Sequence, residues 1–237
     1  MSEPASVETS LSAVPPPVPD FPDPGRLLRM SRGFSCLFWS MPLMSAAHAL
    51  ALASVLPPRW TMGILLGSFL PLVCGLWMLG GGGNPAFKRG GRMDFAVLAA
   101  AAAMFLSPFL AWWAAAPDRI YFAVNAALHY LATIGLLAGL NGLSGACARR
   151  LGDLPLKRES AAGLGMVLWL SGCTAGALAW LFHRSGILEA GLATVLAHVS
   201  QLPSEARTLF MLPYAMTAYV MWRAKETGLR CAIRPAP

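Results

Sequence analysis

Charged side chains are scarce in this chain of 237 residues, of which only 12% are Asp, Glu, Lys or Arg. A soluble domain of average composition carries about 25%. The few charges gather in short polar stretches. The segments between them are almost wholly apolar and long enough to cross a bilayer as helices, which takes about 20 residues each. These features exclude an ordinary soluble domain and predict a membrane protein.

Sequence motifs for metal binding and for cofactor-dependent catalysis are also absent. None of the five cysteines forms a CxxC pair, and no Cys and His spacing matches a zinc site, so no metal ligands are predicted. The chain has no phosphate-binding loop, dinucleotide fingerprint, HExxH motif or paired carboxylates. Because the charged loops are also too short to hold a soluble catalytic domain, the sequence favours a protein that is not an enzyme.

Ionisable residues are missing from the centres of the apolar segments. No Asp, Glu, Lys or Arg lies near the middle of any of them. Ion-coupled pumps and carboxylate proteases keep such groups at depth, although burying them is costly, so both classes are disfavoured. The net charge of +7 comes from basic residues at the ends of the segments. The membrane accounts for these residues, and no nucleic-acid partner is predicted.

The apolar segments predict an all-α polytopic membrane helix bundle with six transmembrane helices. The bundle occupies residues 26–226, between a Pro-rich N-terminal tail at 1–25 and a polar tail at 227–237. The N-terminal tail has seven prolines and no Lys or Arg, so we expect it to be disordered. The six predicted spans are 34–56, 60–79, 95–116, 120–147, 161–182 and 206–222.

The distribution of Lys and Arg predicts the orientation of the spans. With a cytoplasmic N-terminus, fourteen basic residues fall on the cytoplasmic side and four on the other, as the positive-inside rule requires. Both termini are then cytoplasmic. The apolar segment 187–202 is short, and crossing would place the basic C-terminus outside, so we interpret it as an interfacial or partly re-entrant helix on the outer face. A seventh span is the alternative.

The cellular location is inferred from composition. Arg greatly outnumbers Lys, and Ala is abundant, which is typical of a GC-rich bacterial genome. We therefore expect a multi-pass protein of the bacterial inner membrane, in contact with the lipid bilayer.

Pairs of small residues predict where helices approach one another closely. Three spans carry glycines four residues apart, and such pairs favour close contact between membrane helices. The contact is either within the bundle or with another membrane subunit. The three pairs are Gly63/Gly67, Gly135/Gly139 and Gly172/Gly176.

Prolines lie inside four of the predicted spans. Each removes one backbone hydrogen bond and favours a kink, so a small transporter with kinked helices is a further hypothesis. These residues are Pro42, Pro71, Pro108 and Pro213.

Two histidines are the candidate functional residues of the interior. His48 lies about eight residues from the outer end of the first span, and His129 about nine residues into the fourth. At 1.5 Å per residue, both lie about 12–14 Å below the outer surface. Equal depth on two helices is what axial ligation of a haem b requires. The pair also suits a quinone or other ligand pocket, with Asn125 one turn above His129 and Tyr130 beside it, or a structural polar contact.

The string Gly142-Leu143-Ser144-Gly145 resembles the GxSG motif of rhomboid intramembrane proteases, which also have a six-span core. In that family the serine begins a membrane helix, and a histidine on a later span acts as its base. Here the string ends a predicted span, and the span at 206–222 has no histidine. A serine without a base is a poor nucleophile, so a helix end closing onto a loop explains the string better.

These observations favour a non-enzymatic integral membrane protein, such as an accessory or scaffold subunit. A haem- or quinone-binding redox protein that uses His48 and His129 is the alternative hypothesis. A small transporter with Pro-kinked helices is the third.

Overall fold

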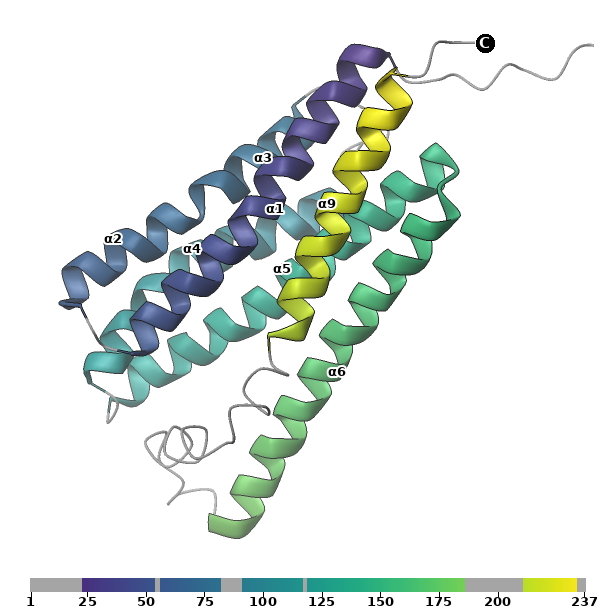
Figure 1. Ribbon diagram of the computed structural model, residues 1–237. Helices are drawn as coiled ribbons and strands as arrows, with labels where there is room; N and C mark the ends of the chain where they lie inside the picture. Colours follow the sequence, from purple (N-terminus) through teal and green to yellow (C-terminus); the bar gives the residue numbers. More distant parts are fainter. Residues whose placement is uncertain (1–22, 54–55, 82–90, 117–118, 186–210, 234–237) are drawn as a thin grey trace, which may run out of the picture.

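The computed structural model describes residues 23–53, 56–81, 91–116, 119–185 and 211–233. Over these residues the chain forms seven α-helices and no β-strand (Figure 1), so the predicted all-α class is confirmed. The helices are α1 Pro24–Leu52, α2 Pro58–Ser68, α3 Leu70–Gly80, α4 Arg92–Ala115, α5 Ile120–Leu151, α6 Leu154–Ser185 and α9 Leu212–Ile233.

Five segments are long and apolar enough to cross a membrane, by length and composition. They are α1, the α2–α3 pair, α4, α5 and the part of α6 up to Ala177. In α9 only the first half is apolar, because Arg223, Lys225 and Glu226 lie in its second half. The chain is therefore a multi-pass helical membrane protein.

Several helices extend beyond the predicted spans. α1 begins at Pro24, ten residues before the predicted start at 34, because Pro is favoured in the first turn of a helix. α9 continues to Ile233, so most of the segment predicted as a polar tail from residue 227 is helical. Hydropathy predicts only the part of a helix that lies inside the bilayer, so it does not show how far the helix continues beyond it. The predictions for residues 1–22 and 187–202 lie outside the described residues.

The second predicted span is broken into two helices. α2 ends at Ser68 and α3 begins at Leu70, with Phe69 as the junction. Pro71 has no N–H and cannot donate to the carbonyl of Gly67, one turn earlier. At the junction, the Phe69 amide donates to Leu66 O, three residues earlier in the chain, at 3.2 Å. Pro42 and Pro108 do lie inside helices, whereas Pro213 occupies the first turn of α9 and does not interrupt it.

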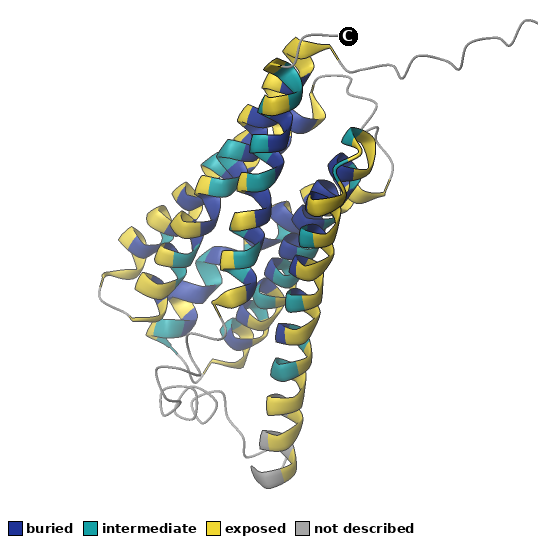
Figure 2. Cartoon of the chain, turned by 45° about the vertical axis from the view of Figure 1, so that its right-hand side comes forward, coloured by how far each residue is buried: buried dark blue, intermediate teal, exposed yellow. Residues whose placement is uncertain are grey.

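The helices pack side by side, with α4 on α5, α1 on α9, α1 on α3 and α5 on α6. The start of α1 lies next to the end of α9, where Ser31 Oγ donates to Lys225 O at 3.0 Å. α6 stands at the side of the bundle and exposes residues along much of its length (Figure 2).

The closest helix crossing joins α1 to α3 through Gly33 and Gly75. A Cβ atom at Gly75 would lie 2.8 Å from Gly33 O and 2.9 Å from the Leu37 side chain. Real Cβ atoms do not approach so closely, so only glycine allows this contact. Neither residue belongs to a predicted small-residue pair. Around the crossing lies the main core, which includes the fully buried Phe34 and Leu72.

Of the three predicted glycine pairs, one packs inside the bundle. A Cβ at Gly139 would lie 3.1 Å from Ala96 on α4, and one at Gly135 would lie 3.5 Å from Phe95. A Cβ added to any glycine of the other two pairs would meet no described atom within 4 Å. These open positions are Gly63, Gly67, Gly172 and Gly176.

Candidate functional site

The two predicted histidines meet in the half of the bundle where α1 ends and α5 begins. His48 on α1 and His129 on α5 face each other, with their Nε2 atoms 2.8 Å apart. The ring centroids are 5.0 Å apart and the rings are tilted by 41°. His129 is 4% exposed, and His48 is half-buried. The equal depth inferred from helix rise therefore corresponds to direct contact between the two side chains.

The proline in α4 lies next to the group that positions His129. Pro108 cannot donate to Met104 O, four residues earlier, and Ser107 Oγ donates to that carbonyl instead, at 2.9 Å. The preceding carbonyl, of Ala103, lies 2.9 Å from His129 Nδ1. α4 thus provides a backbone acceptor for the imidazole at the level of the proline.

These distances assign the tautomers of the two rings. A carbonyl only accepts, so His129 Nδ1 carries the proton that it donates to Ala103 O. In a neutral ring Nε2 is then an acceptor, and His48 must donate through its own Nε2–H. Two neutral rings therefore satisfy both inter-helix bonds.

The geometry of the pair does not fit a haem held between the two rings. Metal–nitrogen bonds are about 2 Å long, so an iron ligated on both faces would hold the two Nε2 atoms about 4 Å apart with the porphyrin between them. At 2.8 Å the nitrogens share a hydrogen bond, and no macrocycle can lie between them. The described residues also contain no group of three His, Cys, Asp or Glu side chains that could hold a metal ion.

The polar neighbours of His129 have other partners. Asn125 Nδ2 donates to Tyr121 O in its own helix, at 2.8 Å. The Tyr130 hydroxyl lies 2.6 Å from Thr174 Oγ1, so it joins α5 to α6. Neither side chain extends the histidine pair into a larger polar pocket.

Ser144 of the GLSG string is buried and packs against α9. Its hydroxyl donates to Met221 Sδ at 3.9 Å, and no histidine of the described residues is hydrogen-bonded to it. The string lies within α5, which continues to Leu151, so it is neither at the start of a helix, as in rhomboid proteases, nor at a helix end, as predicted. This placement agrees with the rejection of a rhomboid-type nucleophile.

A third polar contact lies deep in the bundle at Asn141. Its amide donates to Leu137 O and to Thr217 Oγ1 on α9, each at 2.9 Å. Its Oδ1 lies against Gly163 of α6, in the space that a side chain at residue 163 would occupy. A Cβ atom at Gly163 would overlap this oxygen. Asn141 Oδ1 and Trp113 Nε1 are the buried side-chain atoms of the described residues that have no hydrogen-bond partner.

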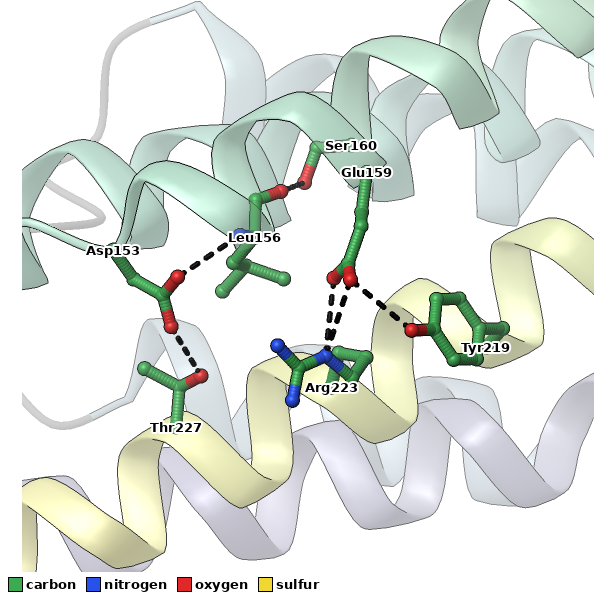
Figure 3. A network of polar contacts seen from close by, with 7 residues as sticks. All are labelled: Asp153, Leu156, Glu159, Ser160, Tyr219, Arg223 and Thr227. Carbon is green, nitrogen blue, oxygen red and sulfur yellow. Dashed lines mark hydrogen bonds and ion pairs between the residues drawn. The ribbon is translucent and has the colours of Figure 1, made fainter.

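A polar network joins α6 to α9 at the basic end of the bundle (Figure 3). Glu159 on α6 pairs with Arg223 Nε at 3.1 Å and accepts a hydrogen bond from the Tyr219 hydroxyl at 3.0 Å. Asp153 accepts from Leu156 N at 2.9 Å, which caps the start of α6, and from Thr227 Oγ1 at 2.7 Å. The sequence contains no motif that identifies the pairs between α6 and α9, because their partners are at least 60 residues apart in the chain.

Asp153 makes the α6–α9 contact sensitive to acid. Partial burial acts to raise the pKa of its carboxyl, but the hydrogen bonds from Leu156 and Thr227 and the charges of Arg223 and Arg230 outweigh burial and lower it. A lowered pKa means that ionised Asp153 stabilises the fold above about pH 4 and that this contribution disappears as the pH falls further. We expect Asp153→Ala to cost about 1 kcal/mol of unfolding free energy at pH 7, mainly through the lost cap.

Thermal unfolding in detergent between pH 3 and pH 7 measures this effect. The difference between the wild type and Asp153→Ala should shrink towards pH 3. Glu226→Ala is the matched control, because its pair with Lys225 is long, at 3.8 Å, and lies at the surface, where such pairs contribute little. A difference that stays constant over this range would contradict the proposed role of the ionised carboxylate.

Basic residues from three helices surround a hollow near this network. It lies between α4, α5 and α6, and its lining includes Arg92, Arg149 and Lys157. In the sequence, these residues indicate only the orientation of the spans. Their convergence on one site depends on how the helices pack, which the loop charges do not reveal.

No protein-family model matches the chain, and neither a curated protein nor a solved structure is significantly similar to it.

Proposed function

We propose that this chain is a non-enzymatic membrane protein that serves as an accessory or scaffold subunit. The observation that carries this proposal is that the interior polar side chains pair with one another across helices. His48 pairs with His129 and Tyr130 with Thr174, while Asn141 pairs with Thr217. Such contacts stabilise helix packing in a membrane. Among the described residues, no serine hydroxyl or cysteine thiol is hydrogen-bonded to a histidine.

The proposed topology has six spans, with both termini in the cytoplasm of a bacterium and the spans in its inner membrane. The excess of Lys and Arg on one side supports this orientation. The contact between Ser31 and Lys225 also supports it, because it places the start of α1 and the end of α9 at the same end of the bundle.

Two helix faces are suited to contact with another membrane subunit. A small residue lets a second helix backbone approach closely, and the glycines at 63, 67, 172 and 176 face no described atom within 4 Å. The pair at 135 and 139 is occupied by α4 and is not available. On α6 the open glycines are accompanied by the exposed side chains of Leu168 and Trp169.

Affinity purification from native membranes tests the subunit proposal. We expect a membrane protein, or a second copy of this chain, to co-purify in a near-stoichiometric amount and to be lost in the double variant Gly172→Leu/Gly176→Leu. Ala127→Leu is the control for added apolar bulk, because it places a leucine at an exposed position of α5. A chain that purifies alone, or a partner retained by the double variant, would contradict the α6 contact.

The absorption spectrum of the same preparation tests the redox alternative. Because the two Nε2 atoms are in direct contact, we expect no haem Soret band. A Soret band that disappears in His48→Leu and His129→Leu would overturn the proposal of a non-enzymatic subunit.

A further inference from the structure

The hollow between α4, α5 and α6 has a volume of about 360 Å³ and lies towards the end of the bundle where α5 ends and α6 begins. Its floor is a bare strip of α5 that includes Gly139, Gly142 and Gly145, which recur every third residue. Gly139 packs against Ala96 of α4 and Gly145 lies close to Ser160 of α6, so the bare strip is open at Gly142. A Cβ atom at Gly142 would have only Arg92 Cδ near it, at 4.0 Å, so this part of the floor opens into free space.

Three cations lie around the end of the hollow. Arg92 is the first residue of α4, Arg149 lies in the last turn of α5, and Lys157 lies in the first turn of α6. All three are exposed, and within the described part of the chain none forms an ion pair. Two carboxylates lie close in the sequence to Lys157: Glu159 on α6, and Asp153, which caps α6. Figure 3 shows that both point towards α9. The cations therefore present a net positive site.

The walls below the cations are apolar. Phe95 on α4 and Leu164 on α6 line the hollow, and they are 49% and 38% exposed. Asn141 lies at the floor, but its amide group is bonded to Leu137 and Thr217 and adds no charge. From Arg149 to Gly139 the hollow follows ten residues of helix, or about 15 Å. A charged end and an apolar wall of this length match an amphiphile better than a small anion.

We propose that this hollow binds one anionic phospholipid of the adjacent leaflet. The phosphate accepts hydrogen bonds from Arg92, Arg149 and Lys157, and an acyl chain lies along Phe95 and Leu164 on the bare strip of α5. Arg guanidinium groups bind phosphate through paired N–H donors, and basic pockets between membrane helices suit anionic head groups. A free phosphate ion would use the cations but not the apolar wall. The proposal does not depend on the subunit contact of α6.

Lipid binding to the purified full chain tests the proposal. Native mass spectrometry and thermal unfolding would compare phosphatidylglycerol, phosphatidylcholine with the same acyl chains, and inorganic phosphate. We expect phosphatidylglycerol to remain bound and to raise the unfolding temperature, and the other two to have little effect. Equal effects of both lipids would overturn the role of the cations. Protection by inorganic phosphate alone would indicate an anion site without a lipid.

Two sets of variants locate the binding. The triple variant Arg92→Gln/Arg149→Gln/Lys157→Gln should weaken phosphatidylglycerol binding at least tenfold. The matched control, Arg26→Gln/Arg29→Gln/Arg32→Gln, removes the same charge from the start of α1 and should leave binding within about twofold. A similar loss in both would show that only surface charge attracts the lipid, which overturns the proposed site.

Gly142→Leu provides a second test that does not alter charge. The added side chain has room in the hollow, so the variant should fold normally and exclude the acyl chain, with phosphatidylglycerol binding reduced at least tenfold. Unchanged lipid binding in a folded Gly142→Leu protein would overturn the proposed position of the chain, even if the triple variant fails to fold.

Discussion

Replacing Gly75 with leucine is expected to cause the largest loss of stability of any single substitution proposed for this protein. The α1 and α3 backbones approach each other at this residue, and even a Cβ would lie 2.8 Å from Gly33 O. A leucine side chain therefore forces the two helices apart and separates the core around Phe34 and Leu72. Overpacking of this kind costs about 1–3 kcal/mol or more, and we expect a value at the upper end.

The temperature of unfolding of the purified chain in detergent measures this effect. Gly67→Leu is the matched control, because it makes the same change in the same predicted span at a position with no described atom within 4 Å. It should change the unfolding free energy by no more than about 0.5 kcal/mol. Similar stability of the two variants would show that α1 and α3 do not cross at Gly33 and Gly75.

His129→Leu is expected to have the second largest effect. The substitution removes the hydrogen bond to Ala103 O and leaves His48 Nε2–H without its acceptor. Single inter-helix hydrogen bonds in membranes contribute about 0.6–2 kcal/mol, and a buried unpaired donor costs more than a deleted pair. We expect a loss of about 2–3 kcal/mol, and a smaller loss for His48→Leu, because His48 is less buried and because His129 bonds α4 as well as His48.

A double-mutant cycle measures the contribution of the His48–His129 contact to the unfolding free energy, separately from the other contacts of the two residues. If the two rings share a hydrogen bond, the loss in the double variant should be about 1 kcal/mol smaller than the sum of the two single losses. Asn125→Leu is the control, because Asn125 lies one turn away on α5 and bonds only its own helix. Additive effects of the two histidine substitutions would contradict direct contact between the rings.

The histidine pair shows how much of the candidate site can be predicted from the sequence. Helix rise alone predicts that His48 and His129 lie at the same depth, because the first span ends, and the fourth begins, at the same surface of the membrane. Depth does not determine the rotation of a helix about its axis. The rotation of the two helices brings the His48 and His129 rings into a direct hydrogen bond, and the Ala103 carbonyl beside Pro108 holds the His129 ring in place. This arrangement leaves no space for a porphyrin between the rings.

The glycines show the opposite case. The spacing of four residues identifies Gly135 and Gly139, which do pack on α4, but it identifies Gly63 and Gly67 equally, and these face open space. The residues at the closest approach of α1 and α3, Gly33 and Gly75, have no other glycine four residues away in their helices. A close crossing needs one small residue on each of two helices, and no pattern within one helix reveals its partner.

The sequence by itself determined the all-α membrane bundle and the places where most helices cross the bilayer. Each span must be apolar over the thickness of the hydrocarbon core and must satisfy its backbone hydrogen bonds internally, so the evidence is local to each segment. Only the tertiary structure decided which polar side chains meet, which glycines face a neighbour, and that Arg92, Arg149 and Lys157 surround one hollow. These features depend on the rotation and order of helices distant in the chain, which composition and hydropathy do not constrain.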